Sequence, residues 1–391
     1  MNTPSSTGAL DGIRVIDLSR ILGGPYCGQI LGDHGADVLK VEPPQGDDTR
    51  TWGPPFREGV ASYYMGLNRN KRGLQLDLAS AQGRQLLLGL LEGADVLVEN
   101  FKTGTMEKWG LGYDALSTRF PRLVHCRVSG FGADGPLGGI AGYDAAVQAL
   151  TGVMSVNGES GGEPLRVGLP VIDLVTGLNA ALGVMLALHE RQRSGRGQFV
   201  EASLYDSGLS LLHPHAANWF MDGRRPTLTG NAHPNIYPYD AFPTRTAPIF
   251  LAVGNDRQFR LFCEHLSAPA LASDGRYSQA GARSSHRSEL RSAIESLLRD
   301  QDGAALAEDL MRLGVPCAPI HTVDQALQHP HTAHREMVVR IGDAYTGIAS
   351  PIKLGRTPAS YRLPPPVRCT ASAESPDQAG AAITTMPSSS A

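Results

Sequence analysis

Apolar runs and helix-like stretches alternate along the first third of the chain. The apolar runs lie at 13–18, 37–42, 95–100 and 123–129, and a helical pattern covers 83–91. A shorter stretch, 74–78, alternates apolar and polar residues. Short apolar runs separated by helices are typical of βαβ units, whose strands pair in parallel through right-handed crossovers. The pattern therefore predicts a parallel sheet flanked by helices.

The pattern changes beyond this region. It becomes helical over 141–193, and residues 222–323 combine Gly- and Pro-rich turns with one apolar run, 249–253, and two or three amphipathic helices. We expect a large α/β domain over 1–221, a smaller α/β domain over 222–325, and a return segment over 326–363. Residues 364–391 contain almost no large apolar side chains, which predicts a disordered tail.

Composition narrows the class of protein. The 391 residues are 41% hydrophobic with a net charge of −3, and no Lys/Arg block offers a footprint for nucleic acid or an anionic membrane. The N-terminus lacks the pattern of a signal peptide, and the apolar run 177–188 is short and glycine-rich for a membrane span. Five scattered cysteines predict free thiols rather than disulfides. We expect a cytoplasmic enzyme.

Asp173 stands alone between the apolar run 167–172 and a helix rich in Gly and Ala. A carboxylate in such surroundings is neutralised by a partner, caps a helix, or serves as a nucleophile or proton carrier. The residue alone leaves these three roles open.

Three segments could contact a ligand. Gly23, Gly24 and Gly28 follow a predicted strand, as in dinucleotide-binding loops, but with the spacing G-G-x-x-x-G, so a structural turn and a nicotinamide or another nucleotide ligand all remain possible. Residues 67–73 concentrate cations and amides, and 100–104 offers an amide, an aromatic ring and a cation after a predicted strand. Such donors suit phosphates, although solvated surface charge is the simpler alternative for 67–73.

Histidine pairs at 213/215 and 329/331 suggest a metal, but their spacing matches no zinc pattern, so we predict no metal site and no permanently bound cofactor. Ser203 and Ser207 lack the G-x-S-x-G context of a serine hydrolase.

Several motifs together resemble the class III CoA-transferase family, which includes formyl-CoA transferase, carnitine CoA-transferase and α-methylacyl-CoA racemase. The resemblance covers about 10–364 and rests on the segments 10–18, 32–42, 67–72, 95–101, 129–132 and 195–198 and on the segment around Asp173. It implies a Rossmann-like large domain, a smaller α/β domain, and an interlocked homodimer of two threaded chains.

The resemblance also implies a chemistry. Family members use the aspartate matched by Asp173 as a covalent nucleophile, so CoA would move from an acyl-CoA to a carboxylic acid through an aspartyl anhydride and an aspartyl-CoA thioester. The implied CoA contacts are Leu22, Gly23, Leu67, Asn70, Lys71, Arg72, Asn100, Phe101, Lys102, Lys108 and Tyr143. A cation that relatives often carry is replaced by Pro43.

Two other functions remain open. The racemase branch carries a histidine where this chain has Tyr143 and a glutamate near Pro243, so proton exchange at the α-carbon lacks two of its bases. A non-catalytic CoA-binding protein is the third possibility. For a transferase, His233, Tyr237 and Tyr239 could bind the second carboxylate of a dicarboxylic acid such as succinate, with succinyl-CoA as the donor.

Overall fold

The computed structural model describes residues 8–366. These residues form two compact units, one of 8–151, 167–211 and 330–366, the other of 152–166 and 212–329. The predicted limits were 1–221, 222–325 and 326–363, so the structure assigns 152–166 and 212–221 to the second unit and 330–363 to the first. The predicted tail began at 364, but Pro365 and Pro366 are buried. The rest of it, 367–391, lies outside the described residues.

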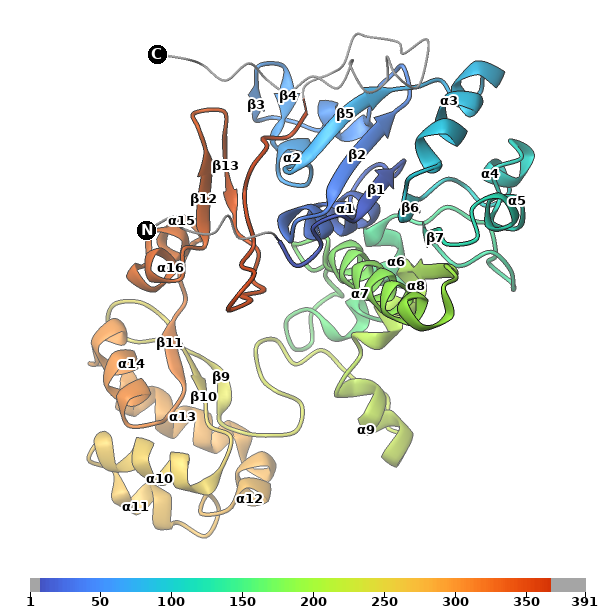
Figure 1. The fold of residues 1–391 in the computed structure, drawn as a ribbon. Helices are drawn as coiled ribbons and strands as arrows, with labels where there is room; N and C mark the ends of the chain where they lie inside the picture. The colour runs from blue at the N-terminus through green and yellow to red at the C-terminus, as the bar shows by residue number, and fades with distance from the viewer. Residues whose placement is uncertain (1–7, 367–391) are drawn as a thin grey trace. The chain divides into compact units, whose positions relative to one another are not determined.

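The first unit is built on a six-stranded sheet in the order β5-β2-β1-β6-β7-β8, in which every neighbouring pair is parallel (Figure 1). The predicted α/β class with a parallel sheet is confirmed. The strands are β1 (Arg14–Asp17), β2 (Asp37–Glu42), β5 (Lys71–Gln75), β6 (Val96–Glu99), β7 (Val124–Ser129) and β8 (Phe199–Ser203).

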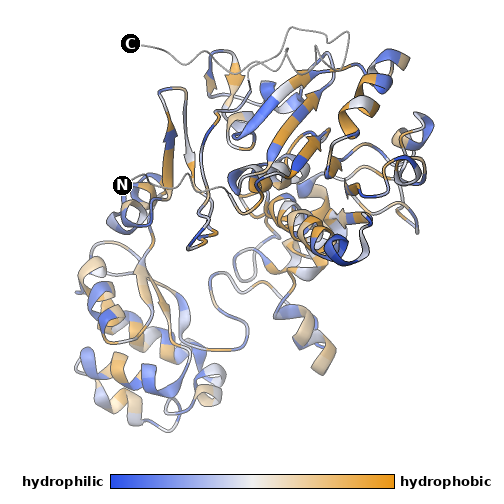
Figure 2. Cartoon of the chain, viewed as in Figure 1, coloured by the Kyte–Doolittle hydropathy of each residue, from blue (hydrophilic) through white to orange (hydrophobic). Residues whose placement is uncertain are grey.

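The fifth strand begins earlier than predicted. The alternating pattern placed it at 74–78, whereas β5 starts at Lys71, which pairs with Val38 of β2. The sheet therefore incorporates Lys71 and Arg72, the last charged residues of the donor-rich segment, which the pattern placed before the strand. In Figure 2, β5 at the edge of the sheet carries a hydrophilic stretch, whereas the central strands are coloured as hydrophobic.

Helices cover both faces of the sheet. Along β1, Ile16 faces a core that includes Leu87 and Leu91 of α3, while Asp17 faces Lys71 and Gly28 beneath α1. This alternation of successive side chains is the period of a strand. The helices and short strands of the first unit are α1 (Gly23–Asp33), α2 (Ser62–Met65), α3 (Ala81–Leu91), α4 (Thr105–Lys108), α5 (Tyr113–Arg119), α6 (Asp144–Leu150), α7 (Val171–Ser194), α8 (Leu204–Ser210), α16 (Pro330–His334), β3 (Phe56–Arg57), β4 (Val60–Ala61), β12 (Val338–Ile341) and β13 (Tyr345–Ile348).

The long helix α7 packs against α1, β7 and β8. A side chain at Gly177 would place its Cβ 2.7 Å from the backbone oxygen of Gly23, so the absence of a Cβ at 177 allows α1 and α7 to approach closely. The sequence suggested an apolar run too short for a bilayer, but the helix has 24 residues and is long and apolar enough, by length and composition only, to cross one. Its buried side, including Ile172, Ala180 and Val184, forms part of the core.

The second unit contains a three-stranded antiparallel sheet, β11-β10-β9, covered by amphipathic helices. Its core includes Phe242, Ile249, Phe259 and Ile294. The predicted smaller α/β domain is confirmed. Its elements are α9 (His215–Asp222), β9 (Tyr239–Phe242), β10 (Ile249–Ala252), α10 (Asp256–His265), α11 (Pro269–Ser273), α12 (Ala280–Ser285), α13 (Arg287–Leu298), α14 (Gly303–Arg312), β11 (Cys317–Pro319) and α15 (Val323–Gln328).

The end of the described chain returns to the first unit and binds the segment 67–72. Asn70 accepts from the backbone N–H groups of Arg362 and Leu363 through Oδ1, at 2.7 and 3.1 Å, and its Nδ2 donates to the backbone oxygen of Ser360. Arg50 donates to the backbone oxygen of Pro366 at 3.0 Å. These bonds fix the return segment in place.

Candidate active site

A cavity of about 260 Å³ opens at the carboxyl ends of β1, β6, β7 and β8. Ligands of open α/β sheets bind at this edge, where the loops after the strands converge. The cavity lies entirely within the first unit. Its lining residues are Arg20, Ile21, Leu22, Gly23, Asp48, Asn100, Phe101, Lys102, Thr103, Val128, Ser129, Gly130, Gly139, Ile140, Ala141, Gly142, Tyr143, Asp173 and Leu204.

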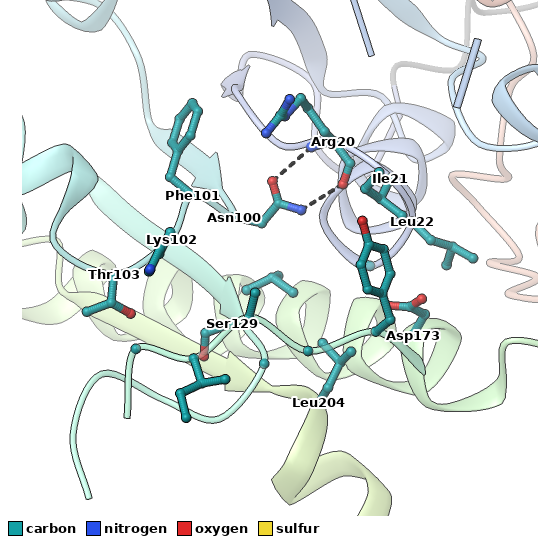
Figure 3. Close-up of a pocket in the computed structure, with 18 of the residues that line it drawn as sticks. Arg20, Ile21, Leu22, Asn100, Phe101, Lys102, Thr103, Ser129, Asp173 and Leu204 are labelled. Carbon is teal, nitrogen blue, oxygen red and sulfur yellow. Dashed lines mark hydrogen bonds between the residues drawn. The ribbon is translucent and has the colours of Figure 1, made fainter. Parts of the chain in front are cut away.

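The loop between β1 and α1 is held rigidly at one wall of this cavity. The backbone N–H of Arg20 donates to Oδ1 of Asn100 at 2.9 Å, and Nδ2 of Asn100 donates to the backbone oxygen of Arg20 at 2.7 Å (Figure 3). Ile21 has a φ of +72°, a left-handed conformation that is rare for a β-branched residue. Such strain persists only where surrounding contacts enforce it, and it is common at functional sites. The loop thereby presents Leu22 and Gly23 to the cavity.

Asp173 faces the same cavity as the third residue of α7. Among residues 8–366, no group donates a hydrogen bond to its carboxylate or forms an ion pair with it, and its side chain is largely removed from water. Burial, followed by the negative charge of Asp144, raises the pKa of Asp173 to about 7. Of the three roles that the sequence left open, this placement argues against neutralisation by a partner and against capping.

Six other predicted site residues lie around this cavity with Asp173, namely Leu22, Gly23, Asn100, Phe101, Lys102 and Tyr143. Both amide atoms of Asn100 bind the backbone of Arg20, so this side chain shapes the wall of the cavity. Lys102 is exposed and forms no ion pair within the described part of the chain. Tyr143 is 63% exposed, so it does not belong to the core.

Four of the predicted CoA contacts, Leu67, Asn70, Lys71 and Arg72, lie away from this cavity. Lys71 is buried and donates to Oδ2 of Asp17 at 2.9 Å and to the backbone oxygen of Pro25 at 2.7 Å. Arg72 forms an ion pair of 2.6 Å with Asp37, at the amino end of β2. Leu67 is buried, and Asn70 binds the return segment. These donors hold the first unit together, so the structure gives no support to their contact with CoA.

The remaining predicted residues are not among those that line the cavity. Lys108 is exposed at the end of α4 and does not line the cavity. His233, Tyr237 and Tyr239 belong to the second unit, where Tyr237 is 2% exposed in the core and the rings of His233 and Tyr239 lie 5.2 Å apart. Within 8–366, no three His, Cys, Asp or Glu side chains are grouped closely enough to hold a metal ion.

The sequence interpretation missed a second cavity beside the first. It has a volume of about 250 Å³, shares Phe101 with the Asp173 cavity, and is mainly apolar. Its lining residues are Val41, Glu42, Pro43, Gln45, Leu76, Asp77, Leu78, Ala79, Phe101 and Trp109. The loops after β2 and β5 supply most of them. The prediction placed residues 76–78 inside a strand, whereas they follow the end of β5 and line this cavity.

Two polar residues near Asp173 were also missed as site residues. Burial, then the charges of Asp173 and Asp144, raises the pKa of Tyr63 in α2 to about 12. Asp144 begins α6 and accepts hydrogen bonds from the first turn of α7. Neither residue belongs to a spacing pattern that sequence alone would single out.

The fold and site define an α/β protein whose parallel sheet presents, within residues 8–366, an unpaired and largely desolvated carboxylate at a cavity. Residues 10–368 match CoA-transferase family III, and the chain belongs to this family. This result confirms the resemblance found in the sequence, and the protein is a class III CoA-transferase.

Individual relatives agree with this assignment. The chain is 40% identical over 374 residues to a succinate–glutarate CoA-transferase of Agrobacterium fabrum, covering 93% of this chain and 94% of that protein. It is 39% identical to a succinyl-CoA:mesaconate CoA-transferase of Haloarcula hispanica, covering 95% and 97% of the two chains. A crystal structure of a CaiB/BaiF family protein from Brucella suis is similar, with a TM-score of 0.83, 37% identity, and coverage of 96% of this chain and 98% of the other.

Proposed function

We propose that this enzyme transfers CoA between carboxylic acids with Asp173 as the covalent nucleophile. The supporting observation is the carboxylate of Asp173, which faces the cavity without a hydrogen-bond or ion-pair partner in the described chain. A carboxylate without donors is a stronger nucleophile than one that is solvated or paired. The relatives named for succinyl-CoA, glutarate and mesaconate support succinyl-CoA as the donor and a dicarboxylic acid as the acceptor.

The proposed reaction conserves the energy of the thioester. An Asp173 oxygen bonds to the acyl carbon, the carbon–sulfur bond breaks, and CoA leaves as a thiolate. The thiolate then attacks the Asp173 carbonyl and releases the donor acid, which leaves an aspartyl-CoA thioester. The carboxylate of the acceptor attacks this carbonyl to give a new anhydride and free thiolate, and the thiolate takes the new acyl group and frees Asp173. No step consumes water, so the site must exclude it.

The two adjoining cavities suggest how CoA is bound. The apolar cavity between Leu76, Leu78 and Trp109 suits the planar base of the nucleotide, and Phe101 forms a wall of both cavities. Lys102, next to Phe101 and exposed, suits a phosphate. The thiol end would then extend into the cavity that contains Asp173. This arrangement replaces the predicted contacts at 67–72 with residues of the following loop.

Asp173→Ala tests the proposed function. The variant should lose exchange of isotope between labelled succinate and succinyl-CoA, measured by mass spectrometry, and hydroxylamine should no longer trap a modified residue at 173. Asp48→Ala is the matched control, because Asp48 is the other carboxylate that lines the cavity. Undiminished exchange in Asp173→Ala would refute the covalent role. Deuterium uptake at the α-carbon without an acceptor acid would instead support a racemase.

We also propose that the enzyme is a cytoplasmic homodimer, as the family resemblance implies. On the side of α7 that the first unit leaves open, Leu178, Leu182, Met185 and Leu186 are 41%, 58%, 39% and 62% exposed. An apolar stripe of this kind favours burial against another chain. Because threaded chains cannot separate into folded monomers, Leu182→Glu should lower the yield of folded dimer in analytical sedimentation. A monomeric wild-type enzyme would contradict the proposal.

A further inference from the structure

The helix that carries Asp173 begins in an unusual way. The first amides of an α-helix need acceptors, and a side chain just before the helix normally supplies one. Here the residue at that position is Pro170, which supplies none. Oδ2 of Asp144 instead accepts from the backbone N–H groups of Ile172 and Asp173, at 2.8 and 3.1 Å. The cap of α7 is therefore a carboxylate from another helix.

Asp144 is itself held in place. It is 7% exposed, and its Oδ1 accepts a bond of 2.6 Å from Nε2 of Gln148, one turn later in α6. Oε1 of Gln148 accepts from the backbone N–H of Val167 at 2.9 Å. The pair Asp144 and Gln148 thus holds both ends of the segment 167–173 against α6.

This arrangement has a direct effect on Asp173. A carboxylate in the first turn of a helix is normally stabilised by nearby amides and the helix dipole. Here Asp144 accepts from the amides of Ile172 and Asp173, and Pro170 has no N–H to offer, so the Asp173 carboxylate is left facing the cavity without donors. The charge of Asp144 also opposes a second negative charge close by.

We propose that Asp144 is the positioning residue for the nucleophile, and that it keeps Asp173 oriented and unstabilised by occupying the amides at the start of α7. The proposal rests on the covalent role of Asp173. Asp144 acts through the helix and through its charge, so its removal should change the pH dependence of the reaction as well as its rate.

Asp144 of α6 and Tyr63 of α2 are titratable groups whose charges act on or respond to Asp173, Tyr143 lines the same cavity, and Tyr26 of α1 lies against α7 at Gly177. Tyr63 stays protonated below about pH 12, so across the neutral range Asp144 is the neighbour whose charge acts on Asp173. Asp144→Asn removes this charge but keeps an oxygen that can accept from the two amides. Asp144→Ala removes both the charge and the accepting oxygen. Asp144→Glu keeps the charge on a side chain that is longer by one methylene group.

The experiment measures kcat and KM for CoA exchange from pH 5 to 9 in these variants. Without the Asp144 charge, the pKa of Asp173 should fall, so the acid limb of kcat/KM in Asp144→Asn should move to lower pH. Asp144→Ala should lower kcat by roughly 10- to 100-fold with little change in KM, because the nucleophile loses its position. Asp144→Glu should recover part of this loss.

Asp206→Asn is the control, because it removes one exposed carboxylate from the first turn of α8 and changes the net charge equally. It should leave the pH profile unchanged. An unshifted acid limb in a folded, active Asp144→Asn variant would overturn the proposal, and so would full activity in Asp144→Ala. If Asp173→Ala is inactive while these variants behave as wild type, only this inference fails; if Asp173→Ala is active, the proposed function fails.

Discussion

Replacing Asp173 with asparagine should stabilise the fold at neutral and alkaline pH. The raised pKa means that ionising this carboxylate costs free energy in the folded state and none in the unfolded chain. The contribution of Asp173 to stability is therefore complete below its unfolded pKa and is lost as the pH rises through the folded value of about 7. Asparagine has nearly the same shape and carries no charge, so its variant avoids the loss.

The magnitude follows from the two pKa values. The rise from 3.8 to about 7, at about 1.4 kcal/mol for each pH unit, corresponds to roughly 4 kcal/mol at pH 8 as an upper limit. At pH 5 the same relation gives roughly 1.6 kcal/mol, and below pH 3.8 the benefit disappears. Few single substitutions stabilise a protein by more than about 1 kcal/mol, so the effect is distinctive.

Urea unfolding of both proteins at pH 5 and pH 8 measures this difference. The variant should be more stable at both pH values, with a larger gain at pH 8. Asp134→Asn, at an exposed carboxylate, is the control and should change the stability by no more than about 0.5 kcal/mol. A gain that is equal at the two pH values, or a loss at pH 8, would refute the view that Asp173 is held in the fold as a costly anion.

Three further predictions concern the walls of the site. Lys102→Ala should raise KM for succinyl-CoA about tenfold with little change in kcat, because one phosphate contact is lost, whereas the exposed Lys353→Ala should not; an unchanged KM would exclude this contact. Asn100→Ala should lower the unfolding free energy by about 1–3 kcal/mol and reduce kcat, since two hydrogen bonds that hold Arg20 disappear. A variant as stable as the wild type in thermal unfolding would contradict this role of Asn100. Arg50→Met should destabilise the protein by about 3–5 kcal/mol in urea unfolding, because Glu42 would remain buried without its partner; a shift below 1 kcal/mol would show that water reaches this pair.

The sequence predicted the architecture because strand and helix periods are local properties. Strand β2 occupies 37–42 as expected. Strands β1, β6 and β7 each begin one residue later than predicted, and β1 and β6 also end one residue earlier. The order of the strands depends on crossovers between distant segments, so no local period could give it.

The site was predicted only in part, for a physical reason. A lysine or an asparagine next to a strand has the same sequence signal whether it faces a ligand or a buried carboxylate. Phe101 and Lys102 follow the end of β6 and do lie at the cavity, whereas Lys71 turns beneath α1 to Asp17. The role of Asp144 depends on a contact between residues 28 or more positions apart, which a single sequence does not show.

The bonds between Asn70 and the return segment have a consequence for biosynthesis. A ribosome releases residues 8–211 long before residues 360–366, yet Asn70 and Arg50 form part of their hydrogen bonds with this late segment, in addition to those with Asp33 and Glu42. The nascent first unit must therefore wait, incomplete, while the whole second unit emerges and has time to fold. Shortening the chain before residue 360 should remove these bonds and make the truncated polypeptide a target for chaperones and proteases.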